Sequence, residues 1–580
     1  MACLPAAQPD KAARPPVILI SIDTLRADHL GIYGRPHNPT PHIDSFAENG
    51  TFFTQIDSQI PLTLPSHTVL FTSTYPFQNH IEENAEIVPS GVVTLASVLQ
   101  KNGYHTGAFI GSSLLSRRYG LNKGFETYDS PFFATGEQTA GPYSVRVRRD
   151  GALVIHSALN WLTSRQNGPA FAFIHLFDLH TPYAVRGFSG QRLLPNAPGY
   201  DAEIQYVDEL LGHLKDTLVR RGLWQRSVVI VLADHGESLG DHGETSHGYF
   251  AYESTLHVPL IVHWPESDTS HPKKVDEPAG LIDVAPTLLN YLHIAVPTSF
   301  AGKNLLDNSN KHEIYSETAY AHDAFRWAML CEIRIGETVY ISAPHPELYN
   351  LQLDPTERKN VIAAHADEAR SLKAQLAALL ARYSNVHSTA TADRSGPSQA
   401  ALRSLGYIAA GLQHSNDDSG PDPKDRLPEY QAYEKALTEL YSNQATAAVT
   451  GFRNLLAKDP ANTLARYYLG ESYMKLNQPS EALREWQAAI GRDHGYEPAL
   501  VAMGDIYLVQ KLPAKARDAF EQATLLEPMD SEAQLRLAVA EEQLGQTQDA
   551  NRHIEAACRA GYDDSHECEQ ALAQLRQKFR

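Results

Sequence analysis

Three short runs of β-branched and other apolar residues, at 17–22, 171–176 and 228–232, have the length of buried strands. Helical stretches, for instance at 152–162 and 204–218, separate them. Strands that alternate with helices predict an α/β fold with a largely parallel sheet. The three runs lead into Asp23, Asp178 and Asp234. Because such sheets bind ligands beyond the carboxyl ends of their strands, we expect the three carboxylates at one crevice.

A second pattern occupies the C-terminal part of the chain. Small residues recur there with a step of 34 residues: Gly470, Gly504 and Ala538 in one series, and Ala448, Ala482, Ala516 and Ala550 in another. Small residues let two helices approach closely, and aromatic residues such as Tyr473, Tyr507 and Phe520 fill the neighbouring space. This period resembles the tetratricopeptide repeat, which implies an all-α solenoid of about four repeats over 429–561 and a capping helix.

With 580 residues the chain is too long for one hydrophobic core. We therefore predict a flexible tail over residues 1–14, an α/β domain over 15–384 and the repeats over 428–580. The segment 385–427 is rich in Pro, Gly and polar residues and is predicted to be a linker. Within it, the more apolar stretch 401–409 is expected to dock on the first domain.

The composition, 43% hydrophobic and 20% charged, is that of an ordinary globular protein. The longest apolar runs are far shorter than a membrane span, so no transmembrane segment is expected. A net charge of -19 argues against nonspecific attraction to nucleic acid or anionic lipid.

Four cysteines are too few for a disulfide scaffold. Cys558 and Cys568 are expected to be free thiols, and their pairing in an oxidising compartment is the alternative. The N-terminus has neither the basic nor the apolar region of a signal peptide, which as it stands predicts a cytoplasmic protein. Cys3, followed by Ala, Pro and Gln, would also suit a lipidated cysteine behind an upstream signal, so a periplasmic or lipid-anchored location stays open.

Three segments carry candidate chemistry. Asp23 follows the first strand, and residues 61–68 (PLTLPSHT) place Thr63 and Ser66 before a helix, where amides stabilise an anion. Residues 232–248 hold Asp234, His235 and further histidines, which suits a metal. Taken singly, each segment has a simpler interpretation as a helix cap or a solvated loop.

Together these segments resemble the sulfatase branch of the alkaline-phosphatase superfamily. There an acidic strand end, a nucleophile in a Cys/Ser-x-Pro-x-Arg turn and an Asp-His-Gly-Glu loop follow in this order. Residues 177–183 (FDLHTPY), 283–289 (DVAPTLL) and 347–360 (ELYNLQLDPTERKN) are similar to later segments of the family. The resemblance covers about residues 15–385 and implies an α/β/α sandwich and a hydrolase of sulfuric or phosphoric esters.

Carried over by position, the resemblance implies a divalent metal ion (Zn, Mn or Ca) on Asp23, Asp234 and His235, bridged by Thr63 as nucleophile. Asn84 stands where phosphonate monoester hydrolases of the superfamily contact the substrate oxyanion. The roles of leaving-group acid or substrate contact fall to His180 and His247. A candidate second metal site comprises Asp178, His180 and His247.

The departures from the family pattern change the expected chemistry. Thr63 cannot be converted to formylglycine, as a Cys or Ser nucleophile can, His67 replaces the arginine of the signature, and Thr24 replaces an acidic metal ligand. Threonine is the nucleophile of nucleotide pyrophosphatases, lipoteichoic acid synthases and phosphoethanolamine transferases in the same superfamily. The resemblance therefore favours phosphodiester-type substrates.

A binding scaffold is the alternative: a degenerate sulfatase-like domain that serves the repeats. The departures at positions 24 and 67 favour it, and the retained Asp23, Thr63, Asp234 and His235 argue against it. In either case the concave face of the repeats is expected to bind a protein partner.

Overall fold

The computed structural model describes residues 14–37, 39–84, 86–132, 148–164, 168–181, 183, 199–307, 313–384, 420–491, 496–528, 530–561 and 565–580. The stretch 401–409, which the sequence predicted to dock on the first domain, lies outside these residues. In the described chain, none of the helices combines the length and apolar character that crossing a bilayer requires.

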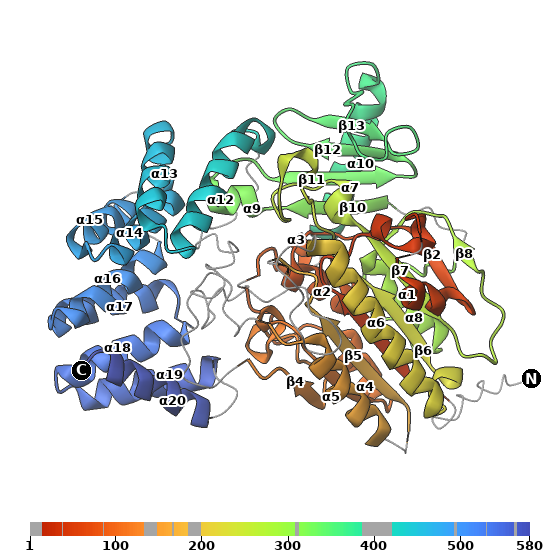
Figure 1. Ribbon diagram of the computed structural model, residues 1–580, viewed down its shortest axis with the longest axis horizontal. Coiled ribbons are helices and arrows are strands. Elements are labelled where there is room, and N and C mark those ends of the chain that lie inside the picture. Colours follow the sequence, from red (N-terminus) through yellow and green to blue (C-terminus); the bar gives the residue numbers. More distant parts are fainter. Residues whose placement is uncertain are drawn as a thin grey trace, which may run out of the picture.

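A nine-stranded sheet forms the centre of the first domain, in the order β4-β3-β5-β1-β6-β7-β2-β8, with β9 paired to β2 (Figure 1). Its strands are β1 (Val17–Ile22), β2 (Gly50–Asp57), β3 (His105–Phe109), β4 (Thr127–Asp129), β5 (Ala170–Leu176), β6 (Val228–Leu232), β7 (His257–His263), β8 (Lys274–Val275) and β9 (Ala279–Gly280). The half from β4 to β6 is parallel, and β7 runs antiparallel to both β6 and β2. The predicted α/β fold with a largely parallel sheet is confirmed.

Two groups of helices cover the sheet. Helices α1 (Pro41–Asp44), α5 (Gly151–Ser164) and α6 (Gly199–Arg220) form one group; α2 (Thr63–Thr72), α4 (Leu95–Lys101) and α8 (Val284–Tyr291) form the other. Strand β1 is completely buried between the two groups. Five of its six side chains are apolar, and the sixth, Ser21, is hydrogen-bonded to His67. The short helix α3 (Pro76–Asn79) contacts α2 and α10 (Ala366–Ser384), and the short helix α7 (Glu253–Leu256) contacts β7.

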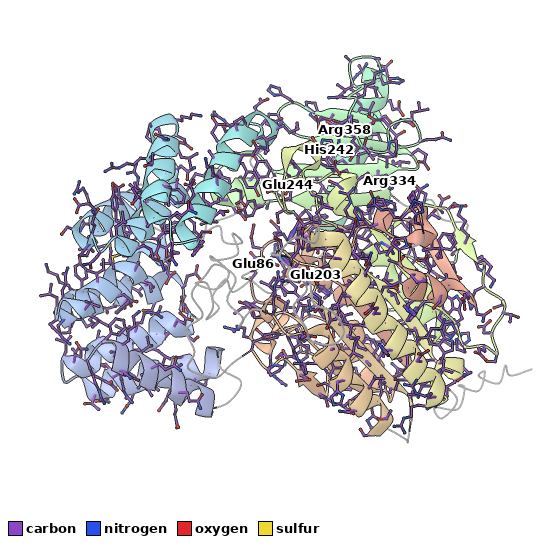
Figure 2. All side chains as sticks on the ribbon, viewed as in Figure 1. Glu86, Glu203, His242, Glu244, Arg334 and Arg358 are labelled. Carbon is purple, nitrogen blue, oxygen red and sulfur yellow. A yellow bond between two sulfur atoms is a disulfide. The ribbon has the colours of Figure 1, made fainter. Side chains whose placement is uncertain are left out.

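A second, antiparallel sheet extends the domain: β10 (Glu313–Thr318), β11 (Leu330–Ile335), β12 (Thr338–Ser342) and β13 (Glu347–Asn350). Helix α10 (Ala366–Ser384) packs on it through Leu372, Leu376 and Leu379. Arg334 joins the two sheets, because its guanidinium contacts both carboxylate oxygens of Asp57 on β2, at 3.0 and 2.9 Å (Figure 2).

The C-terminal region consists of antiparallel helix pairs, as the repeat predicted. The pairs are α12 (Leu427–Tyr441) with α13 (Ala445–Lys458), α14 (Thr463–Lys475) with α15 (Pro479–Ile490), α16 (Glu497–Val509) with α17 (Pro513–Leu526), and α18 (Ser531–Gln543) with α19 (Thr547–Gly561). Helix α20 (Ser565–Lys578) packs against the last pair. A Cβ atom on Gly470 would lie 2.3 Å from the Trp486 side chain, and one on Gly504 would lie 2.4 Å from Phe520. The small residues therefore stand where one helix touches the next.

The expectation of two free thiols near the C-terminus is wrong. Cys558 on α19 and Cys568 on α20 form a disulfide, with their Cα atoms 5.4 Å apart. The two cysteines stand ten positions apart in sequence, and the contact of α19 with α20 brings them to the distance that a disulfide spans. The sequence alone could not supply this distance.

The end of the predicted linker is not a spacer. Residues 420–426 pack on the first domain: Ala328 N donates to Pro421 O at 3.0 Å, and Tyr249 Oη donates to Pro423 O at 2.6 Å. Helix α12 follows at once, and its aromatic residues share an apolar cluster with α9 (Tyr320–Phe325) of the first domain. The repeats, called the array below, are therefore docked on the α/β domain (Figure 1).

Candidate active site

The register of the parallel strands brings Asp23 and Asp234 together. Ser21 pairs with Leu232, and each aspartate stands two residues beyond its member of this pair. Both side chains are fully buried. Asp234 Oδ1 accepts hydrogen bonds from His235 N at 2.9 Å and Thr24 N at 3.3 Å, whereas Asp23 Oδ1 and Asp234 Oδ2 have no hydrogen-bond partner among the described residues.

His235 completes this cluster. Its Nδ1 atom lies 2.9 Å from Gly236 O, which can only accept, so Nδ1 carries the proton and Nε2 presents a lone pair. Asp23, Asp234 and His235 each offer one ligand atom, and these atoms lie within 4.8 Å of one another. Two carboxylates and an imidazole, with carboxylate oxygens that have no hydrogen-bond donor, fit a divalent cation.

Burial disfavours the ionised form of both carboxyl groups in this cluster. It raises the pKa of Asp23 to about 7 and also raises the pKa of Asp234, which Asp23 raises further by repulsion. Two adjacent buried carboxylates without a counter-charge disfavour each other's ionisation. A bound cation would reverse this effect, so the site has the electrostatic character of a metal centre.

Thr63 is the first residue of α2 and its hydroxyl faces the cluster. Oγ1 lies 3.3 Å from Asp23 Oδ2, to which it donates, and 3.5 Å from His235 Nε2. Ser66, the other candidate hydroxyl, donates to Asp234 O at 2.7 Å and so holds the loop after β6. The N-terminal position on α2 gives Thr63 the amide environment that stabilises an anion.

Asn84 contacts the same turn. Its Oδ1 accepts a hydrogen bond from Leu64 N at 2.8 Å, and its Nδ2 is buried with no hydrogen-bond partner among the described residues. A buried amide donor without an acceptor is costly unless a ligand supplies one. Asn84 is therefore suited to contact an oxyanion next to Thr63.

His67, which replaces the arginine of the family signature, lies one turn beyond Thr63. Its Nδ1 donates to Thr63 O at 2.7 Å and its Nε2 accepts from Ser21 Oγ at 2.9 Å. Burial lowers its pKa to about 4, so the ring is neutral and both nitrogens are used. His67 thus supports the turn of Thr63 against β1.

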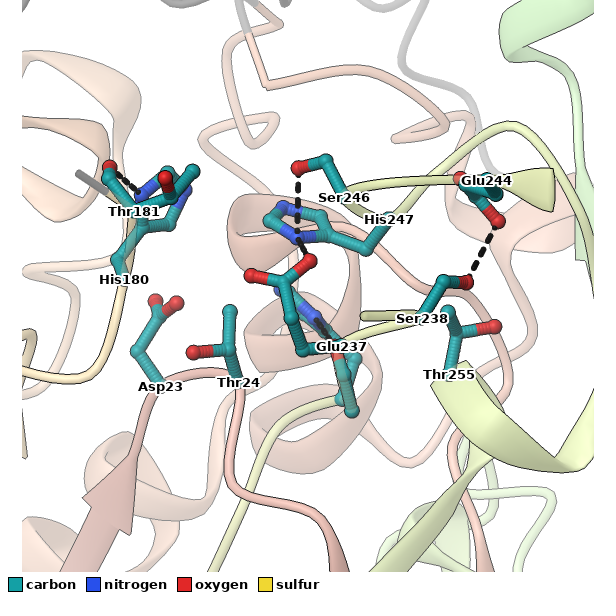
Figure 3. A network of polar contacts seen from close by, with 12 residues as sticks. Asp23, Thr24, His180, Thr181, Glu237, Ser238, Glu244, Ser246, His247 and Thr255 are labelled. Carbon is teal, nitrogen blue, oxygen red and sulfur yellow. Dashed lines mark hydrogen bonds and ion pairs between the residues drawn. The ribbon is translucent and has the colours of Figure 1, made fainter. Parts of the chain in front are cut away.

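His180 and His247 lie beside the cluster. The His247 ring centroid is 4.4 Å from that of His235 and 5.2 Å from that of His180. His247 Nδ1 is 3.1 Å from Glu237 Oε1, whereas His180 Nδ1 donates to Thr181 O at 2.7 Å (Figure 3). Burial, and then the neighbouring His247 and Arg148, lower the pKa of His180, and burial also lowers the pKa of His247 to about 4.

The expected convergence of Asp178 with these residues is not found. Ile22 pairs with Leu176, so Asp178 lies one residue beyond the level of Asp23. Its Oδ1 accepts from Gly151 N at 3.1 Å at the start of α5. Within the described residues, Asp178, His180 and His247 do not form a group with metal-binding geometry. The prediction of a second metal site on these three residues is therefore corrected.

Sequence comparison places this geometry in a family. A family model described as Sulfatase matches residues 15–294, and one described as N-sulphoglucosamine sulphohydrolase, C-terminal, matches residues 240–385. The chain contains a sulfatase domain. Tetratricopeptide repeat models match residues 433–497 and 501–565, so the sulfatase domain is fused to a tetratricopeptide array.

Curated relatives support the assignment. The chain is 25% identical over 336 residues to an ulvan-active sulfatase of Formosa agariphila, a match that covers 51% of this chain and 65% of that protein. It is 25% identical over 436 residues to a Delta 4,5-hexuronate-2-O-sulfatase of Bacteroides thetaiotaomicron, covering 62% of this chain and 86% of that one. The chain thus spans about two thirds of the first relative and most of the second.

A solved structure shares the fold. The phosphonate monoester hydrolase of Silicibacter pomeroyi superposes with a TM-score of 0.53 at 20% identity, covering 64% of this chain and 96% of that one. This likeness confirms the fold of the sulfatase domain. It also shows that the region shared with that protein leaves out about a third of the chain.

Two residues of the sulfatase site escaped the sequence reasoning. His175 on β5 lies with Nε2 3.3 Å from Asp23 Oδ2, and together with His67 and Asp234 it forms a second buried group of potential ligand atoms. A histidine inside an otherwise apolar strand was the available signal. Glu237 is fully buried beside His247, and burial raises its pKa to about 8. Its place next to the Asp-His-Gly motif was the corresponding signal.

Proposed function

We propose that this sulfatase-family protein hydrolyses anionic esters with Thr63 as the nucleophile, and that it favours phosphodiesters over sulfate esters. The observation that carries the proposal is the position of the Thr63 hydroxyl. It lies at the N-terminus of α2, 3.3 Å from Asp23 Oδ2 and 3.5 Å from His235 Nε2. The Thr63 oxygen, the proposed nucleophile, therefore contacts both its proton acceptor and the potential metal cluster.

Asp23, Asp234 and His235 would hold a divalent cation, which would supply Lewis-acid stabilisation of negative charge. Zn and Mn suit the imidazole of this set, and Ca suits its carboxylates. The Thr63 hydroxyl gives its proton to Asp23 Oδ2, its hydrogen-bond acceptor. The Thr63 oxygen then attacks phosphorus in line with the leaving alcohol, and a Thr63 O–P bond forms as the ester P–O bond breaks.

The surrounding residues complete this step. Asn84 Nδ2 donates to a non-bridging oxygen of the substrate, whose negative charge the N-terminus of α2 also stabilises. His247 is the proposed proton donor for the leaving alcohol, because its ring lies against that of His235, with centroids 4.4 Å apart, and its Nδ1 lies 3.1 Å from Glu237 Oε1. Burial, His247 and Arg148 all disfavour the imidazolium form of His180. Water then attacks phosphorus and returns a proton to His247, while Asp23 gives its proton back to the Thr63 oxygen as the Thr63 O–P bond breaks and the monoester product is released.

The choice of phosphorus follows from the nucleophile. A formylglycine enzyme expels sulfate from a hemiacetal and so regenerates its aldehyde, and threonine cannot follow this route. The two curated relatives act on sulfated carbohydrates according to their names, so sulfated uronic acids are the competing substrate class. The array, in turn, is proposed to bind a protein partner on its concave face.

The experiment that tests Thr63 compares substitutions on one helix. Thr63→Ala is expected to lower turnover of bis(4-nitrophenyl) phosphate by at least about a thousandfold, since removal of a nucleophile abolishes the covalent route. Thr63→Ser keeps a hydroxyl and is expected to keep part of the activity. Thr68→Ala is the matched control, because the Thr68 hydroxyl donates to Leu64 O at 2.8 Å within the same helix.

The same assay separates the alternatives when it includes 4-nitrophenyl sulfate and a sulfated unsaturated uronide, each with zinc, manganese or calcium. Phosphodiester turnover that survives in Thr63→Ala would show that the nucleophile lies elsewhere. A protein that binds metal but turns over none of these esters would favour the scaffold alternative. Faster turnover of either sulfate ester by the wild type would contradict the phosphodiester preference.

A further inference from the structure

The array contacts a loop of the sulfatase site. The loop, residues 236–252, lies between β6 and α7 and carries Glu237 and His247. From α12, Gln431 Nε2 donates to Gly243 O at 2.8 Å, and the Tyr430 ring stacks on Tyr249 with centroids 4.0 Å apart and an interplanar angle of 9°. The sulfatase loop and the first helix of the array therefore meet directly.

Gly243 and Tyr249 of the loop pack closely against α12 and the segment before it. Gly243 has a φ of +83°, and a Cβ atom there would lie 2.6 Å from Leu427 Cδ2. Tyr249 Oη also donates to Pro423 O, in the segment that leads into α12. Tyr249 is completely buried, although it belongs to a loop, because aromatic residues of both domains surround it. Without α12 this face of Tyr249 would meet water.

A short chain of bonds leads from this contact to His247. Glu244 accepts a hydrogen bond from Tyr249 N at 2.8 Å. It also accepts one from Ser238 Oγ at 2.9 Å (Figure 3), so its carboxylate joins the two arms of the loop. Ser238 N donates to Ser246 O at 2.8 Å, next to His247. Tyr249 is itself two residues from His247. A shift of Tyr249 is therefore transmitted to the imidazole.

We propose that α12 of the array is a positioning element of the hydrolase site. Tyr430 and Gln431 hold the loop so that His247 stands against His235 and Glu237. This inference rests on the proposed function, because it concerns the residue assigned to leaving-group protonation. The array then serves catalysis directly, in addition to any partner that it binds.

The test compares Tyr430→Ala, Tyr430→Phe and Gln431→Ala with Phe520→Ala. Phe520 is a fully buried ring of α17 that packs on Gly504, so its loss damages the array without touching the loop. Phosphodiesters that differ only in their leaving phenol, from 4-nitrophenol to unsubstituted phenol, report on protonation by His247. The weaker leaving group depends more on an acid.

Tyr430→Ala is expected to lower kcat about tenfold or more for the phenol ester and only about threefold for the 4-nitrophenol ester, since general acids contribute most to poor leaving groups. Tyr430→Phe keeps the stacked ring and is expected to restore kcat. Gln431→Ala, at an exposed side chain, is expected to give the same pattern at smaller amplitude. Phe520→Ala is expected to leave both rates within about twofold, because distant sites act independently.

Amide hydrogen exchange of peptides from residues 236–252 gives a readout that needs no turnover. Faster exchange in Tyr430→Ala and Gln431→Ala, and not in Phe520→Ala, is the expected result. Unchanged exchange together with unchanged leaving-group dependence in Gln431→Ala and Tyr430→Ala overturns the inference. If Tyr430→Ala does not fold, Gln431→Ala decides alone. A wild type that turns over no ester overturns the proposed function, and the exchange data still decide whether α12 orders the loop.

Discussion

The sulfatase site and the array place their important side chains in opposite ways. In the site, Asp23, Asp234 and His235 come from segments far apart in sequence and are brought together by the register of β1 and β6. In the array, Gly470 and Gly504 each meet a residue only 16 positions later, Trp486 and Phe520. The site concentrates buried charge, whereas most of the buried side chains of the array are apolar. Changes in the site should therefore alter chemistry, and changes in the array beyond α12 should alter stability.

The largest effect should follow the loss of a carboxylate of the metal cluster. Asp234→Asn is expected to lower turnover by at least about a thousandfold, because metal-ion catalysis depends on it. Without metal, the variant should unfold at a higher temperature than the wild type, since it lacks one of two adjacent buried carboxylates. Differential scanning calorimetry with and without zinc, alongside kinetics, checks both statements. Asp216→Asn, at an exposed position of α6, is the control.

If Asp234→Asn keeps both its turnover and its stabilisation by metal, the strand-end carboxylate has no chemical role. The contrast between the site and the array would then be wrong.

The disulfide of the array should show the next largest effect. Cys558→Ser is expected to lower the free energy of unfolding of the array by about 2–3 kcal/mol, the range for a cross-link that closes a short loop. Turnover of a small ester should not change, because the bond lies on α19 and α20, at the far end from α12. Denaturant unfolding with and without a reductant measures the first effect. An equal response of the wild type and the variant to reductant would mean that the bond does not form.

Overpacking within the array should have a comparable but smaller effect. Gly504→Leu forces a side chain into the space of the Phe520 ring, and such substitutions cost about 1–3 kcal/mol. Small-ester turnover is expected to persist, because α12 stays docked on the sulfatase domain. Parallel measurement of urea midpoint and kcat tests the prediction. If kcat falls while α12 remains docked, coupling extends through the whole array rather than through its first helix.

The smallest effect is expected at the position where the repeat uses alanine. Ala538 is fully buried on α18 and occupies the place that Gly504 holds one step earlier and Gly470 two steps earlier. Ala538→Gly should cost about 1 kcal/mol, because glycine weakens a helix interior. Thermal unfolding of the array detects this loss. No measurable change would indicate that the last helix pair is already frayed in the wild type.

Sequence reasoning located the strands well because each has a distinct apolar run. Strands β1 and β6 span the predicted residues, and the polar residues after them do lie at the site. Asp178 shows the limit of that reasoning. Its position after β5 looked equivalent, yet one residue of difference in register turned it toward Gly151. Side chains alternate along a strand, so an offset of one position changes the neighbours of a residue completely.

The sequence by itself determined the order of the elements, the 34-residue repeat and the residue types available for chemistry, because these depend on local pattern. Only the tertiary structure decided which of these residues meet. The pairing of Cys558 with Cys568, the position of His175 beside Asp23 and the stack of Tyr430 on Tyr249 each join separate elements. Such contacts depend on strand register and helix packing across the whole chain, and short-range periodicity contains no information about them.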